Sequence, residues 1–289
     1  MRLSSIWIKL ALGLIFGSLI GWCLKPYFAG NITPNSVWLK WGGIELYWYG
    51  LLMAIAVLVC IGLVFWLNRR FNHFPSDPLF FALVWTVVGG FIGARILFVI
   101  LEWSFYSSNL SEIWRVSHGG MSIHGALLGG ALALWLSARF FKLNVLKTSD
   151  LVAIVLPIGQ AIGRFGNFFN SEAFGGPTNL PWKMYVAPQF RPPEFVSSIF
   201  FHPAFLYEAI GNLIIAGILW WLLRSRRNLP AGSIALGYLI LYSSWRFVVE
   251  YFRIDSEHLG ILTIAQWGSL GIIVAGLGIL IYFYKNGRR

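Results

Sequence analysis

The chain has 289 residues, of which 57% are hydrophobic and only 11% are charged, and its mean hydropathy is +0.70. This composition excludes an ordinary water-soluble protein, because such a chain cannot present a normal polar surface to water. The formal net charge of +11 requires no nucleic-acid partner, since basic loops beside anionic lipid headgroups account for it. We therefore expect a polytopic membrane protein that binds no nucleic acid.

Apolar runs of about 20 residues are long enough to cross a bilayer as helices. The expected fold is an all-α polytopic membrane protein with a seven-helix core and an extra N-terminal transmembrane helix. Taken in chain order, the runs predict eight crossings at residues 6–24, 46–67, 79–101, 119–138, 150–169, 203–223, 232–250 and 261–284.

The first run could instead be a secretory signal peptide. No small-x-small cleavage pattern follows it, because in Tyr27-Phe28-Ala29 a bulky residue stands where a small one is needed. An uncleaved anchor is therefore favoured, and it divides the chain into residues 1–30 and a transmembrane domain at 31–289. The two cysteines, Cys23 and Cys60, are isolated in apolar surroundings and indicate neither a disulfide framework nor a metal site.

The connections between crossings give the expected orientation. Residues 68–78, 139–149 and 224–231 are short and basic, and the tail 285–289 is basic as well. Because Lys and Arg concentrate in cytoplasmic segments, these four segments should be cytoplasmic. Both ends of an eight-crossing chain then lie in the cytoplasm.

One long loop stands out on the opposite, extracytoplasmic side, at residues 174–202. It is rich in Pro, Gly and aromatic residues and is longer than an ordinary connection, and such loops are usually functional or mobile. Its five prolines argue against a long helix and leave short strands or a small cap open.

Ionisable and polar residues gather at the extracytoplasmic ends of the predicted crossings, whereas Asp150 is the clearest exception on the inner side. A cation at membrane depth costs about 2.5 to 3.5 kcal/mol on insertion scales, so it marks a functional site by default. The residues that share this depth are Tyr49, Arg95, His124, Arg164, Asn167, Glu172, His202, Tyr207, Glu208, Tyr242, Arg246 and Glu250.

Helical spacing places several of these residues on common faces, because positions three, four or seven apart are neighbours on a helix. One stripe consists of Tyr242, Arg246, Glu250 and Arg253, and another contains Arg164 and Asn167 followed by Asn170 or Ser171. We expect both stripes to face one cavity. In the alternative reading, Arg246 and Glu250 merely neutralise each other at i,i+4, and Asn167 only joins helices.

A histidine among glycines supplies a candidate base. His124 is flanked by Gly119, Gly120 and Gly125, which allow a helix or a lipid headgroup to approach closely. His118 lies six residues earlier and cannot share a helix face with His124, so a zinc pair of the i,i+4 kind is excluded. No metal and no cofactor are expected.

These residue types suit phosphoester chemistry in a lipid. Arginines offer paired donors to phosphate oxygens and keep their charge in a medium of low dielectric constant, so Arg164 and Arg246 suit an anionic headgroup. A base that deprotonates an incoming nucleophile would complete a displacement at the glyceryl carbon.

Four segments carry a family resemblance. HGGMSIHG, GRFGNFFNSEAFG, HPAFLYE and YSSWRFVVEYFR stand in this order, and the similarity runs from about Tyr47 to the C-terminus. The chain resembles the bacterial phosphatidylglycerol–prolipoprotein diacylglyceryl transferases. This resemblance implies transfer of diacylglyceryl from phosphatidylglycerol to the lipobox cysteine of prolipoprotein signal peptides, the first step of lipoprotein maturation. It also implies a thioether product, release of glycerol phosphate and a location in the inner membrane.

The resemblance also assigns roles. Arg164 would bind the phosphate with Tyr49, Asn167, Gly175 and Arg246, while the implied catalytic residues are His124, Arg246, Glu172 and Tyr242. Supporting positions would be Arg95, Glu208, Glu250 and His202.

Two departures from the family are visible. Residues 1–30 extend beyond the usual beginning, and Phe98 stands near Arg95 where the family often carries an aromatic hydroxyl.

Two other classes of protein remain as alternatives. A secondary transporter would also carry intramembrane Arg, His and Glu, but it would normally show internal symmetry and sites at the midplane. A different lipid-modifying enzyme would be an intramembrane protease or a phosphatidyl transferase. The sequence contains neither a Gly-x-Ser-Gly nucleophile motif nor a paired-aspartate metal motif.

Overall fold

The computed structural model describes residues 17–72, 74–116, 119–225, 229–254 and 256–286. Most of the first predicted crossing, and with it most of the predicted anchor at residues 1–30, lies outside these ranges, as do His73 and His118. Residues 17–28, which end this predicted anchor, are helical.

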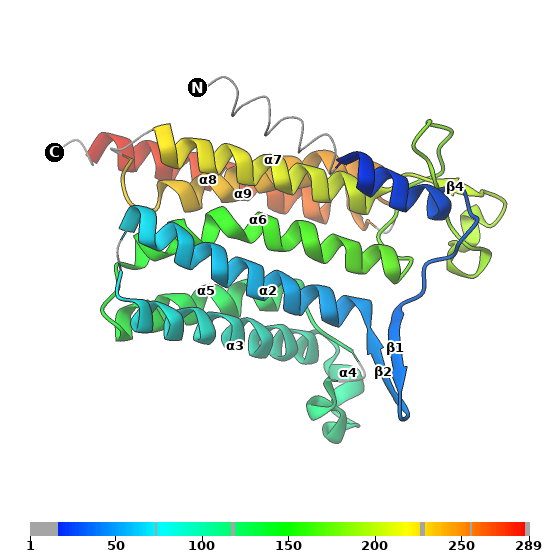
Figure 1. Ribbon diagram of the computed structural model, residues 1–289, viewed down its shortest axis with the longest axis horizontal. Coiled ribbons are helices and arrows are strands. Elements are labelled where there is room, and N and C mark those ends of the chain that lie inside the picture. The colour runs from blue at the N-terminus through cyan, green and yellow to red at the C-terminus, as the bar shows by residue number, and fades with distance from the viewer. Residues whose placement is uncertain (1–16, 73, 117–118, 226–228, 255, 287–289) are drawn as a thin grey trace. The chain divides into compact units, whose positions relative to one another are not determined.

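The described chain is mostly helical (Figure 1), as expected for a polytopic membrane protein. The long helices are α2 (Trp48–Leu67), α3 (Ser76–Leu101), α5 (Ile123–Phe140), α6 (Val145–Phe169), α7 (Ala204–Ser225), α8 (Ser233–Val249) and α9 (Ile264–Asn286). Helix α8 has only 17 residues. Six described segments are long and apolar enough to cross a membrane: Trp48–Phe71, Ser76–Leu101, Ile123–Phe140, Val145–Phe169, Ala204–Ser225 and Ile264–Lys285.

The all-α expectation needs a correction, because short antiparallel strand pairs join the helices. Strands β1 (Val37–Trp41) and β2 (Ile44–Tyr47) form a hairpin before α2, so the predicted crossing at 46–67 began inside a strand. The hairpin turn is Gly42-Gly43, and both glycines have positive φ (54° and 83°), which the tight two-residue turn requires. The other pairs are β3 (Met184–Tyr185) with β4 (Phe200–Phe201) and β5 (His258–Leu259) with β6 (Leu262–Thr263).

Two predicted helix starts were also wrong. Helix α5 begins at Ile123 rather than at residue 119, because Gly119 and Gly120 have positive φ and the Ser122 hydroxyl accepts the backbone N–H of Gly125 (3.4 Å). Helix α6 begins at Val145, five residues before the predicted start. Its polar first turns hid this beginning from a search for apolar runs.

By its internal contacts the chain divides into two compact units. The first comprises Met1–Ala54, Gln160–Ile214 and Tyr242–Ile273, and the second comprises Ile55–Gly159, Ile215–Leu241 and Val274–Arg289. Most long helices therefore contribute one part to each unit, whereas α3 and α5 belong wholly to the second.

In the second unit, α3 and α5 lie side by side (Figure 1). Their glycines bring the backbones together: a Cβ atom on Gly93 would lie 2.5 Å from the carbonyl oxygen of Gly125. Small residues are what allow helices to approach this closely within a membrane. Elsewhere in this unit, the Asp150 carboxylate on α6 accepts the backbone N–H groups of Gly232 (2.7 Å) and Ala235 (2.9 Å) and so caps the start of α8.

The first unit has an aromatic core made of Leu24, Phe168, Phe174, Met184, Val186, Phe201 and Phe205. The helical residues 17–28 pack on it, with Tyr27 edge-on to Phe168 and Phe28 edge-on to Phe205. The loop at 174–202 folds against the same core through β3 and β4. Two of its five prolines begin the three-residue 3-10 helices η4 (Pro188–Phe190) and η5 (Pro193–Phe195). The loop contains no long helix, which confirms the prediction.

Candidate active site

In the first unit, one buried carboxylate lies between two guanidinium groups. Glu208, near the start of α7, is only 2% exposed. Its Oε2 atom pairs with Arg164 Nη2 of α6, and its Oε1 atom lies 3.2 Å from Arg253 Nη1, just after α8. A charge that is this deeply buried is stable only when it is paired. The three side chains together carry one net positive charge, which suits an anionic ligand.

A chain of hydrogen bonds leads from Arg164 to Glu172. Arg164 Nη1 donates to Asn167 Oδ1 (3.3 Å), and Asn167 Nδ2 donates to Glu172 Oε1 (2.8 Å). Glu172 reaches back toward the helix because Ser171 and Ala173 adopt left-handed φ values of 54° and 55°, which are uncommon for residues with a side chain. The turn at the end of α6 therefore orients the Glu172 carboxylate toward the arginine.

Tyr49 packs directly on this part of α6. A Cβ atom on Gly166 would lie only 2.6 Å from the Tyr49 ring, so the missing side chain makes room for the aromatic ring. The neighbouring ring of Trp48 stacks on Phe169 at 4.5 Å between centroids. These contacts hold Tyr49 against the same turn of helix that carries Arg164 and Asn167.

In the second stripe, Arg246 and Glu250 form the i,i+4 ion pair that the alternative interpretation expected. Arg246 Nη2 lies 2.6 Å from Glu250 Oε2, and the Thr263 hydroxyl donates to Glu250 Oε1 at 3.0 Å. The pairing does not use the whole guanidinium, because the buried Nη1 atom of Arg246 has no hydrogen-bond partner among the described residues. Tyr242 lies one helical turn earlier on α8.

Gly175 and His202 hold the loop 174–202 to the start of α7. The Gly175 N–H donates to the His202 carbonyl at 2.8 Å, and a Cβ atom on Gly175 would collide with the Phe252 carbonyl oxygen and with His202 Cβ. His202 Nδ1 lies 3.0 Å from the Tyr207 hydroxyl, which accepts a hydrogen bond from Trp182 Nε1 at 2.7 Å. Burial of the imidazole lowers the pKa of His202.

Arg95 belongs to the second unit and is not a free cation. Its guanidinium donates to four backbone carbonyls, those of Glu112 (2.5 Å), Ile113 (2.9 Å), Gly119 (2.6 Å) and Gly120 (2.8 Å). These carbonyls lie in the segment between α3 and α5, so Arg95 supports the loop that leads to His124.

His124 is the second residue of α5 and is exposed. It lies in the second unit with Arg95, whereas the other predicted site residues lie in the first unit. The predicted residues of the first unit are Tyr49, Arg164, Asn167, Glu172, Gly175, His202, Glu208, Tyr242, Arg246 and Glu250. Within this set, direct contacts connect Arg164 with Glu208, Asn167 and, through Asn167, Glu172, and separate contacts connect Arg246 with Glu250 and Gly175 with His202.

Sequence reasoning gave no role to three residues that complete these contacts. Arg253 was visible in the i,i+7 stripe with Arg246, and Asn170, whose amide donates to Glu172 Oε1 at 3.2 Å, was visible in the stripe with Arg164. No sequence pattern indicated a role for Trp182, because its partner Tyr207 is distant in sequence and only the folded loop brings the two together.

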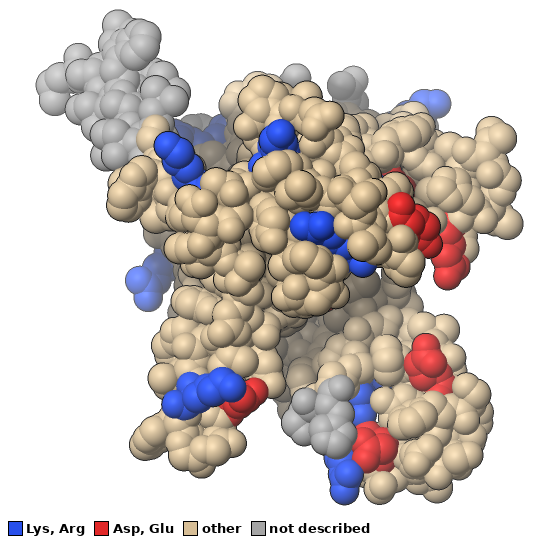
Figure 2. Space-filling model, turned by 90° about the vertical axis from the view of Figure 1, so that its right-hand side faces the viewer, with Lys and Arg blue, Asp and Glu red and all other residues tan. Residues whose placement is uncertain are grey.

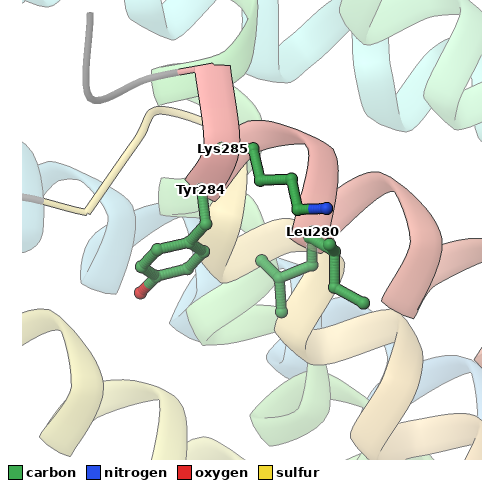
Figure 3. A pocket seen from close by; sticks show the side chains of 4 residues that line it. Leu280, Tyr284 and Lys285 are labelled. Carbon is green, nitrogen blue, oxygen red and sulfur yellow. The ribbon is translucent and has the colours of Figure 1, made fainter.

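Glu172 borders a groove of about 550 Å³, together with residues of the segment before β1, Tyr47, the end of α6 and η4. A second depression, of about 510 Å³, is lined by Leu280, Ile281, Tyr284 and Lys285 (Figure 3). All four residues come from the last turns of α9, so no polar groups converge on it from different elements. Figure 2 shows charged side chains scattered over a mainly uncharged face, as expected when the charged network is largely buried.

Comparison with known proteins agrees with the four sequence segments. Residues 36–282 match the model of the family described as prolipoprotein diacylglyceryl transferase. The relative from Thermosynechococcus vestitus is 41% identical over 259 residues, which cover 89% of this chain and 95% of the relative. The one from Synechococcus elongatus is 44% identical over 256 residues (87% and 88%), and the one from Fervidobacterium nodosum is 40% identical over 272 residues (92% and 91%). All three are named phosphatidylglycerol–prolipoprotein diacylglyceryl transferase. The chain belongs to the prolipoprotein diacylglyceryl transferase family.

Proposed function

We propose that this protein transfers the diacylglyceryl group of phosphatidylglycerol to the lipobox cysteine of prolipoproteins. Membership of the family over residues 36–282 supports this activity, and the names of the relatives give the same donor and acceptor. They give no support to the transporter alternative. The observation that carries the chemistry is the pairing of Arg164 and Arg253 with the single carboxylate of Glu208, which leaves excess positive charge for a phosphate.

The proposed reaction is a displacement at the glyceryl methylene carbon. The carbon–oxygen bond to the phosphate breaks, a carbon–sulfur bond forms, and the electron pair leaves with the oxygen of glycerol phosphate. The thiol proton passes to a base. Guanidinium groups aimed at the phosphate stabilise the charge that develops on the leaving group, and they act most strongly where water is excluded.

We propose that Arg164 and Arg246 bind the phosphate from two helices. Arg246 Nη1 is buried without a partner among the described residues, and the 3.3 Å contact from Arg164 Nη1 to Asn167 is long enough to be exchanged for a shorter one to phosphate. Tyr49, Asn167 and Gly175 complete this proposed lipid site. Glu208, Glu250 and His202 support it through the contacts described above, whereas Arg95 supports the loop that leads to His124.

We assign the base to His124, with Glu172 and Tyr242 as further catalytic residues, following the resemblance. An imidazole is a common general base in enzymes and can accept the thiol proton. Replacement His124→Gln keeps a polar side chain of similar size but removes the base. Retained turnover of the Gln variant at neutral pH would show that the imidazole is not the proton acceptor.

The proposed topology is a seven-helix core, in which the 17-residue α8 is also a crossing, preceded by the extra helix within residues 1–30. The basic connections and the tail 285–289 then face the cytoplasm of an inner-membrane protein, and the charged network faces the extracytoplasmic leaflet. Residues 31–289 form the transferase domain. Packing of residues 17–28 on the aromatic core supports a retained N-terminal helix.

The direct test is an assay with the purified protein, phosphatidylglycerol and a lipobox peptide. A thioether-linked diacylglyceryl peptide and free glycerol phosphate are expected in equal amounts. A peptide with Ser in place of the lipobox Cys is the matched control and should give no product. Absence of thioether with the Cys peptide would refute the proposal, and an uptake assay in liposomes would then test the transporter alternative.

A further inference from the structure

A second polar layer lies one helical turn from the charged network. Gln160 is four residues before Arg164 on α6, and Asn212 is four residues after Glu208 on α7, so each shares a helix face with its charged neighbour. The ion pair between Arg164 and Glu208 shows that these two faces meet. Because successive crossings run in opposite directions, Gln160 and Asn212 fall at the same level, on the side of the ion pair that is farther from the loop 174–202.

This layer contains polar atoms without partners. Asn212 is 1% exposed, yet neither its amide nitrogen nor its amide oxygen makes a hydrogen bond within the part of the chain that the structure describes. The same holds for Gln160 Oε1, Trp245 Nε1 and Arg246 Nη1. Buried polar atoms in native proteins nearly always have a partner, so several unpaired ones at neighbouring positions indicate a group that comes from outside the chain.

Trp245 joins α8 to this layer. Its indole nitrogen lies so close to Gly211 that any side chain at that position would collide with it. Gly211 directly precedes Asn212, so Trp245 packs on α7 at the level of Asn212. Two hydrogen-bond donors are therefore unpaired at this level among the described residues: Asn212 Nδ2 and Trp245 Nε1.

The chemistry of a phospholipid fits this arrangement. Where the phosphate lies beside Arg164 and Arg246, the glycerol backbone with its two acyl ester carbonyls comes next toward the membrane centre. A step of four residues along a helix is about 6 Å, which is of the order of the length of a glycerol unit. Ester carbonyl oxygens accept hydrogen bonds and have no hydrogens of their own, so the two carbonyls match the two unpaired donors.

We propose that Asn212 and Trp245 form a subsite for the acyl ester carbonyls of the donor lipid. This inference rests on the proposed function. The subsite would fix the glycerol backbone on the inner side of the phosphate, so that the reacting methylene lies between two anchored groups. A water molecule shared with a carbonyl would supply the donors that Gln160 Oε1 and Asn212 Oδ1 need.

The test compares diester phosphatidylglycerol with its diether analogue, which keeps the headgroup and chains but lacks both carbonyls. Binding to the full-length protein in nanodiscs and transfer to a lipobox peptide are both measured. The wild-type protein should bind the diester about 3- to 10-fold more tightly, which corresponds to the loss of ordinary hydrogen bonds. The Asn212→Leu and Trp245→Phe variants should each reduce that preference, while their affinity for the diether lipid changes less than about 2-fold.

Leu213→Ala is the matched control, because Leu213 is the next residue on α7 and is 53% exposed. It should keep the wild-type preference. Equal affinity of the wild-type protein for both lipids, or a full preference in both the Asn212 and Trp245 variants, overturns the subsite. Trp245→Phe keeps an aromatic ring and decides the question if Asn212→Leu does not fold.

The two proposals fail separately. A wild-type protein that transfers diacylglyceryl but shows no diester preference refutes the subsite alone. A wild-type protein that prefers the diester in binding, yet forms no thioether, refutes the proposed reaction and leaves the carbonyl subsite standing.

Discussion

Glu208 on α7 binds the guanidinium of Arg164 on α6, although a whole loop separates the two residues in sequence. The carboxylate is buried and accepts Arg253 on its other oxygen, so it both orients Arg164 and spaces the two cations. Glu208 therefore balances the charge of Arg164 and holds its guanidinium in place.

The shape of the Arg164 guanidinium should be essential for transfer. Arg164→Lys keeps the charge but loses the planar fork that matches phosphate, and we expect kcat/KM to fall about 100-fold, or roughly 2.7 kcal/mol. Arg115→Lys is the control, because Arg115 forms an exposed pair with Glu112. Full activity of the Arg164→Lys variant, measured with labelled phosphatidylglycerol, would refute bidentate phosphate recognition.

Removal of the Glu208 charge should destabilise the fold as well as the site. Glu208→Gln leaves Arg164 and Arg253 without their buried counter-charge, and breaking such a pair costs roughly 3 kcal/mol. Equilibrium unfolding in mixed micelles measures the loss. Glu45→Gln, which removes the exposed partner of Lys40, should leave the unfolding free energy nearly unchanged. Equal effects of the two substitutions would contradict the central role of the buried carboxylate.

Adjacent glycines after α6 should differ sharply in their tolerance of a side chain. A Cβ atom on Gly175 would meet the Phe252 carbonyl and lie 2.8 Å from His202 Cβ, so Gly175→Ala should cost about 1 to 3 kcal/mol and reduce transfer. A Cβ atom on Gly176 would lie 3.6 Å from Ile254 Cγ2, an ordinary contact. Gly176→Ala should therefore fold and react like the wild type. An active, stable Gly175→Ala protein would disprove the close approach.

The Asp150 carboxylate should stabilise the start of α8. Asp150→Ala removes the acceptor of two backbone N–H groups, and we expect a loss of about 1 to 2 kcal/mol in unfolding free energy. Asp77, which is exposed in the first turn of α3, provides the control substitution Asp77→Ala. If both variants unfold at the wild-type temperature, Asp150 is not a functional cap.

His202 should make stability depend on pH. Burial lowers the pKa of His202 below its ordinary value of 6.5, so the unfolded chain binds a proton more readily than the folded protein. Stability is therefore present above pH 6.5 and is lost as the pH falls below that value.

The measurement is the melting temperature of the wild type and of His202→Gln between pH 7.5 and about pH 5. The wild type should lose more stability on acidification than the variant. If the melting temperatures of the two proteins fall in parallel with pH, burial of His202 does not contribute to the pH dependence of stability.

The sequence by itself determined the membrane class, most of the crossings and the family. These properties depend on local features: apolar runs have the length of a bilayer, and the motifs are contiguous. Residues spaced three or four apart, such as Arg246 and Glu250, were also predictable as neighbours, because the geometry of a helix fixes their separation.

Only the tertiary structure decided which partner each charge has. Arg95 was predicted to support the site, but its guanidinium donates hydrogen bonds to four loop carbonyls. Glu208 forms ion pairs with both Arg164 and Arg253. The sequence alone also did not predict the strands before α2 or the unpaired polar atoms around Asn212. Packing brings segments together from distant parts of the chain, and the pairing of a buried polar group depends on that packing rather than on its position in the sequence.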